Sequence, residues 1–436
     1  MIKITKFGGS SVANAKQFQK VKSIIESDPD RRFVVVSASG REHKTDNKVT
    51  DLLYLIEAHL NYHVDHLSLF QLIEDRFISI KNELHLTYPI EQDLAQLKES
   101  LNSSISTDYL VSRGEYLTAK LMAEYLGYPF IDAKDIIYFH YDGKIDFDKT
   151  KSALREYLKK HDCFVMPGFY GSLPDGKVKT MSRGGSDITG SILADVMHAD
   201  MYENWTDVSG ILMADPRIVH HPKRIHTITY SELRELSYMG ASVLHEEAIF
   251  PVKEKNIPIN ILNTNHPEEG GTIIVEQDHH NTNQIITGIA GKKNFTVIAI
   301  YKNHMSDEVG IIKRALEVCE NYRISIEHIP SGIDSFSIVV NSDDVKDILY
   351  DMVSDMKKAC QADQIKIIDN IALIATVGRQ MMYRPGISGK LFAVLGKNNI
   401  NIRMIAQGTD EMNIIVGVEN QDYERTVKTI YDNFVQ

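Results

Sequence analysis

The sequence predicts an α/β fold with a mostly parallel sheet, followed by two small βαββαβ repeats. Apolar runs alternate with helical patterns up to about residue 265, which is typical of a layered α/β domain. Residues 31–40 include an apolar run without alternation, as expected for a strand that is covered on both faces. Beyond residue 290 the order changes to strand, helix, two strands, helix and strand, and this order recurs.

Composition excludes several classes of protein. A chain of 436 residues predicts two or three domains, and 43% hydrophobic with 25% charged residues is typical of a globular protein. The net charge of −11 argues against a nucleic acid or an anionic membrane as partner. Cys163, Cys319 and Cys360 are far apart, which predicts neither a disulfide framework nor a metal site. Without a signal segment or an apolar run of ~18 residues, we expect a cytoplasmic protein.

The N-terminal segment "MIKITKFGGSSVA" predicts an anion-binding turn. Residues 2–7 alternate like a strand, Gly8 and Gly9 break it, and a helical pattern runs from Val12 to Glu26. Glycines allow backbone N–H groups to approach a ligand, and the start of a helix carries partial positive charge. Lys6 adds a full positive charge beside them. The alternative is a tight connection without a ligand, which is the commoner role of a Gly-Gly turn.

The rest of the first region also alternates between expected strands and helices. In chain order, we expect a helix from Asp51 capped by Thr50, a helical stretch over 58–107 broken at Pro89, a helix over 112–127 that ends at Gly127, strands within 128–133 and 162–171, a helix after Gly184-Gly185 capped by Ser186, a strand at 201–207, a helix at 231–254 and a strand at 257–263.

The second region consists of two units of ferredoxin-like pattern. Its expected helices cover 307–322, 343–359, 386–398 and 421–434, and the segments "FTVIAIYK", "IKIIDN" and "IALIATVG", at 295–302, 365–370 and 371–378, are expected strands. The segments "RISIEHIP" and "NINIRMIAQG" are expected strands at matching places in the two units. The second unit lacks its last strand, and the segment 284–290, which precedes the first unit, can fill that edge. In that arrangement the two units interlock.

The charged residues that could carry chemistry each have a structural alternative. Glu115 stands three residues after Ser112, which is the spacing of a capping box. Asp187 lies in a first helical turn, where the helix dipole favours any acid. Asp215 and Arg217 can form a local ion pair. The histidine pairs lack metal-ligand spacing, so no metal site is expected.

Taken together, these residues favour a binding site, because they follow strands at strand-to-helix junctions, where open parallel sheets place their ligands. The cations are Lys6, Arg183 and Arg217, and the acids are Glu115, Asp187 and Asp207. Such a mixture suits phosphoryl transfer, which depends on positioning and on neutralising anionic oxygens.

The motifs "KFGGSSVA", "SRGE", "SRGGSDITGSILA", "WTDVSGI" with "DPR", and "GASVLH" resemble those of aspartate kinases, in the amino acid kinase superfamily. The C-terminal repeats resemble two ACT domains. The resemblance implies a three-layer amino acid kinase sandwich at residues 1–283 and ACT domains at 284–369 and 370–436. A kinase for glutamate or N-acetylglutamate, and an inactive amino-acid sensor, are the alternatives.

The resemblance implies transfer of the γ-phosphoryl group of MgATP to the β-carboxylate of L-aspartate, the first step towards lysine, threonine and methionine. A carboxylate is ionised at neutral pH, so the reaction needs no catalytic base. Lys6 would bridge the phosphates, with Asp187 orienting it, and Mg²⁺ would travel on the nucleotide. The aspartate site would comprise Ser39, Thr50, Glu115 and Arg183. The ATP site would comprise Lys6, Gly8, Gly9, Ser10, Gly184, Gly185, Thr206, Asp207 and Arg217.

The sequence departs from the family in the helix that begins "GASVLHEE". Many members have a lysine there as an ATP contact, where this chain has Ser242, and Glu246 replaces a proline. A hydroxyl group cannot replace an ammonium group at a phosphate. Lys253 or Arg217 is a candidate to supply the missing charge.

For the ACT pair, the resemblance implies an amino-acid effector, lysine or threonine, and a homodimer or homotetramer. A purely structural dimerisation module is the alternative. The matching effector positions are Met305, Gly310, Ile311, Glu327 and Ser331, and Asn399 and Gln407 in the second repeat are alternatives.

Overall fold

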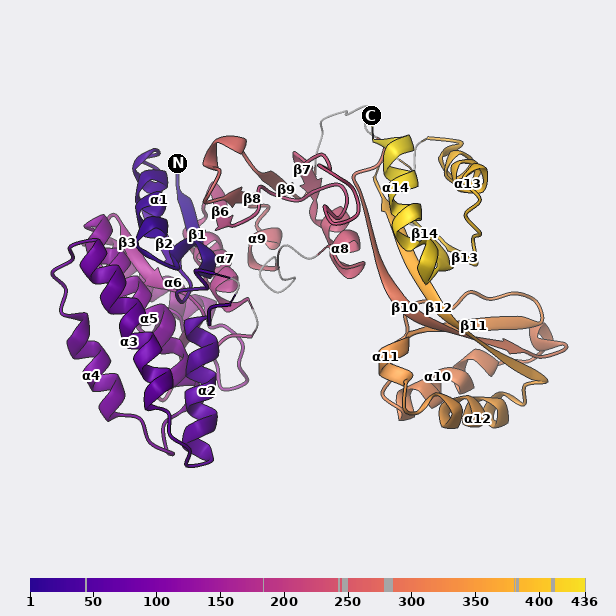
Figure 1. Cartoon of the computed structure of the whole chain (residues 1–436), viewed down its shortest axis with the longest axis horizontal. Helices are drawn as coiled ribbons and strands as arrows, with labels where there is room; N and C mark the ends of the chain where they lie inside the picture. Colours follow the sequence, from indigo (N-terminus) through magenta and orange to yellow (C-terminus); the bar gives the residue numbers. More distant parts are fainter. Residues whose placement is uncertain are drawn as a thin grey trace. The chain divides into compact units, whose positions relative to one another are not determined.

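The computed structural model describes residues 1–436 except 44, 183, 242–243, 245–249, 278–284, 380, 382–383, 409–411 and 436 (Figure 1). The chain forms two compact units. The first unit comprises Met1–Ile211, Arg224–Tyr230 and Val243–Asp278, and the second comprises Leu212–Lys223, Ser231–Ser242 and His279–Gln436. None of the helices in the described ranges is long and apolar enough to cross a membrane.

The first unit is built on a seven-stranded sheet in the order β3-β2-β1-β6-β8-β9-β7. Its strands are β1 (Lys3–Phe7), β2 (Phe33–Val36), β3 (Phe164–Pro167), β6 (Met201–Thr206), β7 (Thr227–Thr229), β8 (Ile259–Asn263) and β9 (Thr272–Val275). All neighbours pair in parallel except β8 and β9. The predicted mostly parallel sheet is therefore confirmed.

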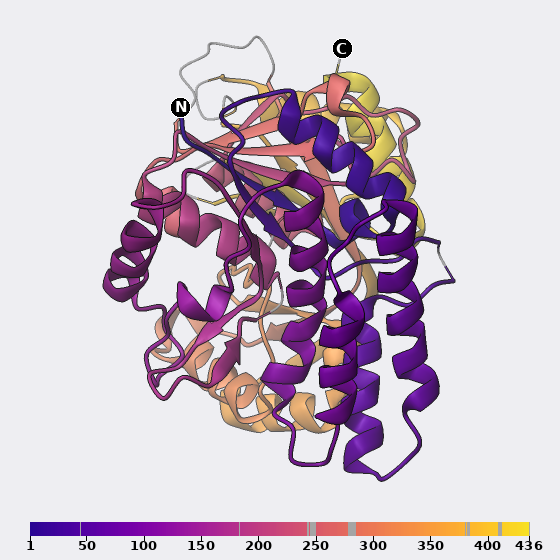
Figure 2. The same ribbon diagram turned by 90° about the vertical axis from the view of Figure 1, so that its left-hand side faces the viewer.

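Helices cover both faces of this sheet. Alternate side chains of a strand point to opposite faces. Phe7 packs into a core with residues of α1 to α5, whereas the neighbouring Lys6 pairs with Asp187 of α7. The helices on the Phe7 side are α1 (Ala15–Glu26), α2 (Val49–Asn61), α3 (Leu67–Glu83), α4 (Ile90–Glu99) and α5 (Thr107–Leu126). Figure 2 shows α2 to α5 side by side.

The remaining elements of the first unit are shorter. They are the helices α6 (Phe147–Leu158), α7 (Gly185–Met197) and α9 (Phe250–Glu254), the hairpin of β4 (Tyr170–Ser172) with β5 (Val178–Thr180), and the 3-10 turns η1 (Gly9–Val12), η2 (Ala133–Asp135) and η4 (Pro267–Glu269). The strand expected within 128–133 is reduced to one bridge, between Phe130 and Val165.

The second unit contains a five-stranded antiparallel sheet in the order β11-β10-β12-β14-β13. The strands are β10 (Gly288–Tyr301), β11 (Ser335–Asn341), β12 (Gln364–Val377), β13 (Met404–Ala406) and β14 (Asn413–Glu419). The helices are α8 (Tyr230–Tyr238, which begins at the last residue of a first-unit segment), α10 (Ile311–Asn321), α11 (Ser342–Val345), α12 (Leu349–Cys360), α13 (Ile387–Lys397) and α14 (Tyr423–Phe434), with the turns η5 (Met305–Asp307) and η6 (Asn420–Asp422).

Two long strands serve both repeats. In β10, Gly288–Lys292 pair with Leu373–Val377, and residues 295–301 pair with the other half of β12 and with β11. The C-terminal half of β12 also pairs with β14. The two strands expected at 365–378 are thus one continuous strand, and residues 288–290 of the expected spare strand lie beside the second repeat.

Several expected boundaries are wrong. The helix expected at 231–254 is interrupted, since α8 ends at Tyr238, Gly240 follows with a φ of 101°, and α9 begins at Phe250. "RISIEHIP" forms only the bridge of His328 to Val339 instead of a regular strand. Of the strand expected at 399–408, only β13 is regular.

Candidate active site

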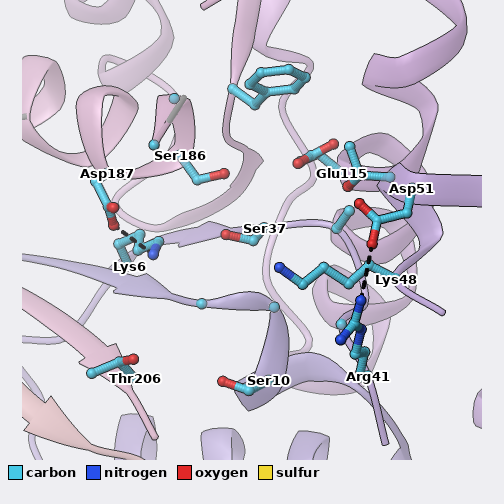
Figure 3. Close-up of a pocket in the computed structure, with 18 of the residues that line it drawn as sticks. Lys6, Ser10, Ser37, Arg41, Lys48, Asp51, Glu115, Ser186, Asp187 and Thr206 are labelled. Carbon is cyan, nitrogen blue, oxygen red and sulfur yellow. Dashed lines mark ion pairs between the residues drawn. The ribbon is translucent and has the colours of Figure 1, made fainter. Parts of the chain in front are cut away.

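A cavity of about 1240 Å³ in the first unit collects most of the predicted site residues (Figure 3). Its walls come from the turn after β1, the segment after β2 with the start of α2, the middle of α5, the start of α7 and the end of β6. Because β1, β2 and β6 are parallel neighbours, their carboxyl ends open at the same edge of the sheet, where such folds bind ligands.

A buried ion pair forms one wall of this cavity. Lys6 is 7% exposed, and its Nζ lies 2.5 Å from Asp187 Oδ1. Asn204 Nδ2 donates to the same oxygen over 2.9 Å, and the Tyr202 hydroxyl donates to the Asp187 carbonyl over 3.1 Å. Asp187 is therefore held by side chains of β6. It fixes the direction of the Lys6 ammonium group at the mouth of the first Gly-Gly turn.

Glycine is needed at two places at this edge of the sheet, where the segment after β2 approaches the first Gly-Gly turn and at the second Gly-Gly turn before α7. A Cβ on Gly40 would lie 2.5 Å from the carbonyl carbon of Gly9, and the Gly40 N–H donates to the Gly9 carbonyl over 2.9 Å. A Cβ on Gly185 would lie 2.6 Å from the Phe169 ring. Gly184 has a φ of 81°, in the left-handed region that favours glycine.

Helix α7 points its N-terminus at the cavity, and its first residues Gly185, Ser186 and Asp187 line the wall. The expected cap by Ser186 is wrong, since Gly184 is the N-cap and Ser186 lies inside the helix. Likewise α2 begins at Val49, so Lys48 and not Thr50 occupies its N-cap. The start of a 13-residue helix attracts anions through its dipole and its free N–H groups.

Glu115 lies on the opposite wall, within α5. This helix begins at Thr107, so the capping-box interpretation of Ser112 and Glu115 is wrong. The Glu115 side chain is buried, and burial raises the pKa of its carboxyl group to about 8, although the Ala38 N–H and the nearby Arg113 oppose this shift. Glu115 Oε2 has no hydrogen-bond partner among the described residues. A buried carboxyl oxygen without a partner suits a cationic group of a ligand.

Most of the expected ligand-binding residues line this cavity. They are Lys6, Gly8, Gly9, Ser10, Thr50, Glu115, Gly184, Gly185, Asp187, Thr206 and Asp207. The Thr206 hydroxyl donates to Asp207 Oδ1 over 3.2 Å at the end of β6. The wall also includes Ser37, Arg41, Lys48, Asp51 and Tyr54, which the sequence analysis did not select.

Two expected residues lie elsewhere. Ser39 is fully buried, and its hydroxyl donates to the Ala13 carbonyl over 3.1 Å, so Ser37 takes its place on the wall. Arg217 belongs to the second unit, where its guanidinium group pairs with Asp215 at 2.6 Å, as the local alternative predicted. Arg183, Ser242 and Glu246 lie outside the described residues, and Lys253 lies on α9 away from the wall.

Comparisons with known proteins decide the family. The model of the amino acid kinase family matches residues 1–263, and that of the ACT domain matches residues 374–434. Aspartokinase 3 of Bacillus subtilis is 36% identical over 99% of this chain and 98% of its own length. The chain belongs to the aspartate kinases of the amino acid kinase family.

Solved aspartate kinases share the whole architecture. The crystal structure of the Clostridium acetobutylicum enzyme, described as allosteric, is 50% identical and matches with a TM-score of 0.93 over 99% of both chains. Escherichia coli aspartokinase III matches over 100% of both chains in two complexes. Its complex with aspartate and ADP is 25% identical with a TM-score of 0.75, and its complex with lysine and aspartate is 26% identical with a TM-score of 0.78.

In this aspartate kinase chain, the expected effector residues lie in the second unit. Gly310 has a φ of 84° and forms the N-cap of α10, which begins at the buried Ile311, and Met305 is buried in the preceding turn. The Glu327 carboxylate accepts a hydrogen bond from the Tyr238 hydroxyl, and burial together with this bond raises the pKa of Tyr238 to about 12. Ser331 bridges to Phe336.

The potential metal ligands lie away from the cavity wall. Among the described residues, His266, Glu268 and Glu269 form an exposed group on and beside η4. None of these three lines the cavity of Lys6 and Glu115. Asp187, at the wall, is already engaged by Lys6 and Asn204.

Proposed function

We propose that this chain transfers the γ-phosphoryl group of ATP to the β-carboxylate of L-aspartate, giving 4-phospho-L-aspartate and ADP. One observation carries the proposal: a buried lysine at a glycine turn shares one cavity with a buried carboxyl group, one oxygen of which has no hydrogen-bond partner among the residues that the structure describes. The first can hold the phosphates of a nucleotide, and the second can receive the ammonium group of an amino acid. The E. coli relative bound to aspartate and ADP supports this pair of ligands.

The chemistry follows from the charges at the cavity. An oxygen of the ionised β-carboxylate forms a bond to the γ-phosphorus, and the bond from that phosphorus to the β,γ-bridging oxygen breaks. No proton leaves the acceptor, so no general base is needed. The Lys6 ammonium group and the N-terminus of α7 offset the negative charge on the phosphoryl oxygens. Ionised Glu115 pairs with the substrate ammonium group.

Mg²⁺ would bind to the phosphates of ATP and offset their charge. The cavity fits a metal that the nucleotide carries. Asp187 is already held by Lys6 and Asn204, and Asp207, at the end of β6, is an exposed acid on the wall that such a metal can approach. Arg183, which the family resemblance assigns to the α-carboxylate, stays part of the proposal, as do the nucleotide roles of Gly8, Gly9, Ser10, Thr206 and Asp207.

We also propose that the second unit binds a regulatory amino acid, lysine or threonine, in a homodimer or homotetramer. The ACT match at residues 374–434 and the lysine complex of E. coli aspartokinase III support this regulation. A catalytic domain at 1–283, ACT domains at 284–369 and 370–436, a cytoplasmic location and a place in lysine, threonine and methionine synthesis complete the proposal.

A substrate panel tests the reaction. The purified chain is incubated with MgATP, hydroxylamine and one of aspartate, glutamate or N-acetylglutamate, since hydroxylamine converts an acyl phosphate into a hydroxamate, which forms a coloured complex with iron(III). We expect hydroxamate with aspartate alone. Formation mainly with glutamate or N-acetylglutamate would replace the proposed substrate, and an absence of product with all three would favour the inactive amino-acid sensor.

A further inference from the structure

We propose that Lys48 binds the reacting carboxylate of the acceptor amino acid and neutralises its charge during phosphoryl transfer, a role that rests on the function proposed above. Lys48 immediately precedes α2 and lines the cavity. Figure 3 shows its side chain extending towards the middle of the cavity from the side that carries Glu115 and Asp51.

Lys48 differs from Lys6 and Arg41 at the cavity wall, because both of these cations are paired with carboxylates. Lys6 is paired with Asp187, and Arg41 lies 3.6 Å from Asp51. Lys48 has no ion pair with a residue that the structure describes, and its side chain makes no capping bond to α2. The Lys48 ammonium group faces the cavity and is not paired with a carboxylate of the described residues. It is therefore available for an anionic ligand.

The segment that precedes Lys48 is held in place by Arg76 of α3. The Asp46 carboxylate accepts from the Glu42 N–H over 3.0 Å and from the Asn47 N–H over 2.7 Å, and it pairs with Arg76 of α3. Arg76 also donates to the Gly40 carbonyl over 2.6 Å. Gly40 and Asp46, near the two ends of this segment, are thereby both tied to Arg76 of α3. This bracing positions Lys48 before a ligand arrives, which lowers the entropy lost on binding.

Position in the cavity favours the amino acid over the nucleotide. The expected nucleotide contact Thr206 lies on the Lys6 side in Figure 3, whereas Lys48 comes from the Glu115 side. An aspartate with its ammonium group at Glu115 carries its β-carboxylate a few bonds away. Two anions, this carboxylate and the γ-phosphoryl group, must then approach each other. A second cation besides Lys6 reduces their repulsion.

Steady-state kinetics of Lys48→Met and Lys48→Arg test this role, with Arg41→Met and the α1 surface variant Lys16→Met as controls. We expect Lys48→Met to raise KM for aspartate and lower kcat, so that kcat/KM for aspartate falls roughly tenfold or more, the effect of losing a charged hydrogen bond. KM for ATP should stay within about twofold of the wild-type value. Lys48→Arg should restore part of the loss, and Lys16→Met should retain wild-type kinetics. Arg41→Met, which removes a guanidinium group already paired with Asp51, should lose less than Lys48→Met.

The outcomes are distinguishable. Because Lys48 is exposed and makes no cap bond, its variants should melt at the wild-type temperature. Wild-type constants for aspartate in Lys48→Met, or an effect confined to KM for ATP, would overturn the assignment while leaving the reaction intact. An equal loss in Arg41→Met would show a general effect of cavity charge and would also overturn it. A wild-type chain that phosphorylates no aspartate would overturn the reaction and the assignment together.

Discussion

Burial of the Glu115 carboxyl group makes one charge of the cavity depend on pH. The pKa of about 8 means that this group is mainly neutral at pH 7 before substrate binds. Pairing with the substrate ammonium group requires the ionised form. We therefore expect aspartate binding to be coupled to loss of a proton from Glu115.

We expect KM for aspartate to fall as the pH rises towards about 8 and to level off above it. The change below this pKa should be at most about tenfold per pH unit, because the ionised fraction changes by that factor. In Glu115→Gln, KM for aspartate should be high and nearly independent of pH over the same range. Initial rates at several pH values check this, with KM for ATP as the internal reference. The same pH dependence in Glu115→Gln would contradict the assigned role.

Individual residues were predicted best where several constraints meet. Lys6 and Asp187 follow from a strand, a glycine turn and a helix start, and the structure joins them in an ion pair. Ser39 was expected from the family resemblance, but β2 ends at Val36 and the sequence beyond it does not define which serine faces the cavity, where the structure places Ser37. Lys48 lies in a polar segment without periodicity, and only tertiary folding brings it to the wall.

At the scale of elements, the segment between β2 and α2 depends on α3. Arg76 donates to the Gly40 carbonyl and pairs with the partly buried Asp46. The pKa of Asp46 is lowered, with the Glu42 N–H and Arg76 outweighing the opposing effect of burial. This segment forms the Lys48 side of the cavity.

We expect Arg76→Ala to raise KM for aspartate several-fold and to lower the melting temperature, since it leaves Asp46 and the Gly40 carbonyl without their shared donor. Kinetics and thermal unfolding measure the two effects. Gln71→Ala, on the same helix, removes only a surface hydrogen bond to Asp75 and should change neither quantity. A normal KM for aspartate in Arg76→Ala would show that the segment does not need this brace.

Helix α8 is attached to the second unit by a buried carboxylate. Glu232 is fully buried and accepts from the Thr287 hydroxyl over 2.6 Å, from the Arg379 N–H over 3.2 Å and from its guanidinium group over 3.1 Å. This helix was expected, but its end was not. Gly240, with a φ of 101°, ends the helical run in a conformation that the sequence alone does not specify.

Removing the Arg379 guanidinium group should leave the buried Glu232 carboxylate without this ion pair. We expect Arg379→Met to lower the free energy of unfolding by about 3 kcal/mol, the usual effect of breaking a buried pair. Arg403→Met, which breaks the exposed pair with Glu419 at 3.4 Å, should lower it by at most about 1 kcal/mol. Denaturant titrations compare the two variants. Equal losses would show that burial does not strengthen the Glu232 pair.

The strands of the second unit show why element boundaries were missed. β10 and β12 each run through both repeats, with register shifts between Lys292 and Val297. The sequence of each long strand is irregular near its middle, and such a pattern predicts two short strands. The sequence does not show that hydrogen bonding to the neighbouring strand continues past the irregular residues. "RISIEHIP" has strand composition, yet it pairs only at isolated positions.

At the scale of the whole molecule, the change of rhythm near residue 290 correctly predicted a mostly parallel sheet followed by an antiparallel one. The sequence did not show that residues 212–223 and 231–242 pack with the C-terminal sheet. Such packing depends on contacts between distant segments, for example the Ile289 N–H with the Met213 carbonyl and the Lys223 N–H with the Tyr431 hydroxyl.

An effector that binds the folded second unit should stabilise the molecule. We expect lysine or threonine, but not alanine as control, to raise the melting temperature of the purified chain in a concentration-dependent way. At about 100 times its Kd, a single-site ligand adds about 2.7 kcal/mol to the stability of the state it binds. Thermal shift with lysine, threonine and both together identifies the effector. No shift with any of these would contradict regulation by these amino acids.

The central claim is that Lys6, at the first glycine turn, holds the phosphates while aspartate attacks in the same cavity. Aspartate-dependent release of ADP by the wild-type chain, Lys6→Ala and the surface control Lys16→Ala tests it most directly. We expect the wild type and Lys16→Ala to release ADP at equal rates. Lys6→Ala should keep its fold by circular dichroism and lose at least about 100-fold in kcat. A folded Lys6→Ala variant with wild-type turnover would contradict the account.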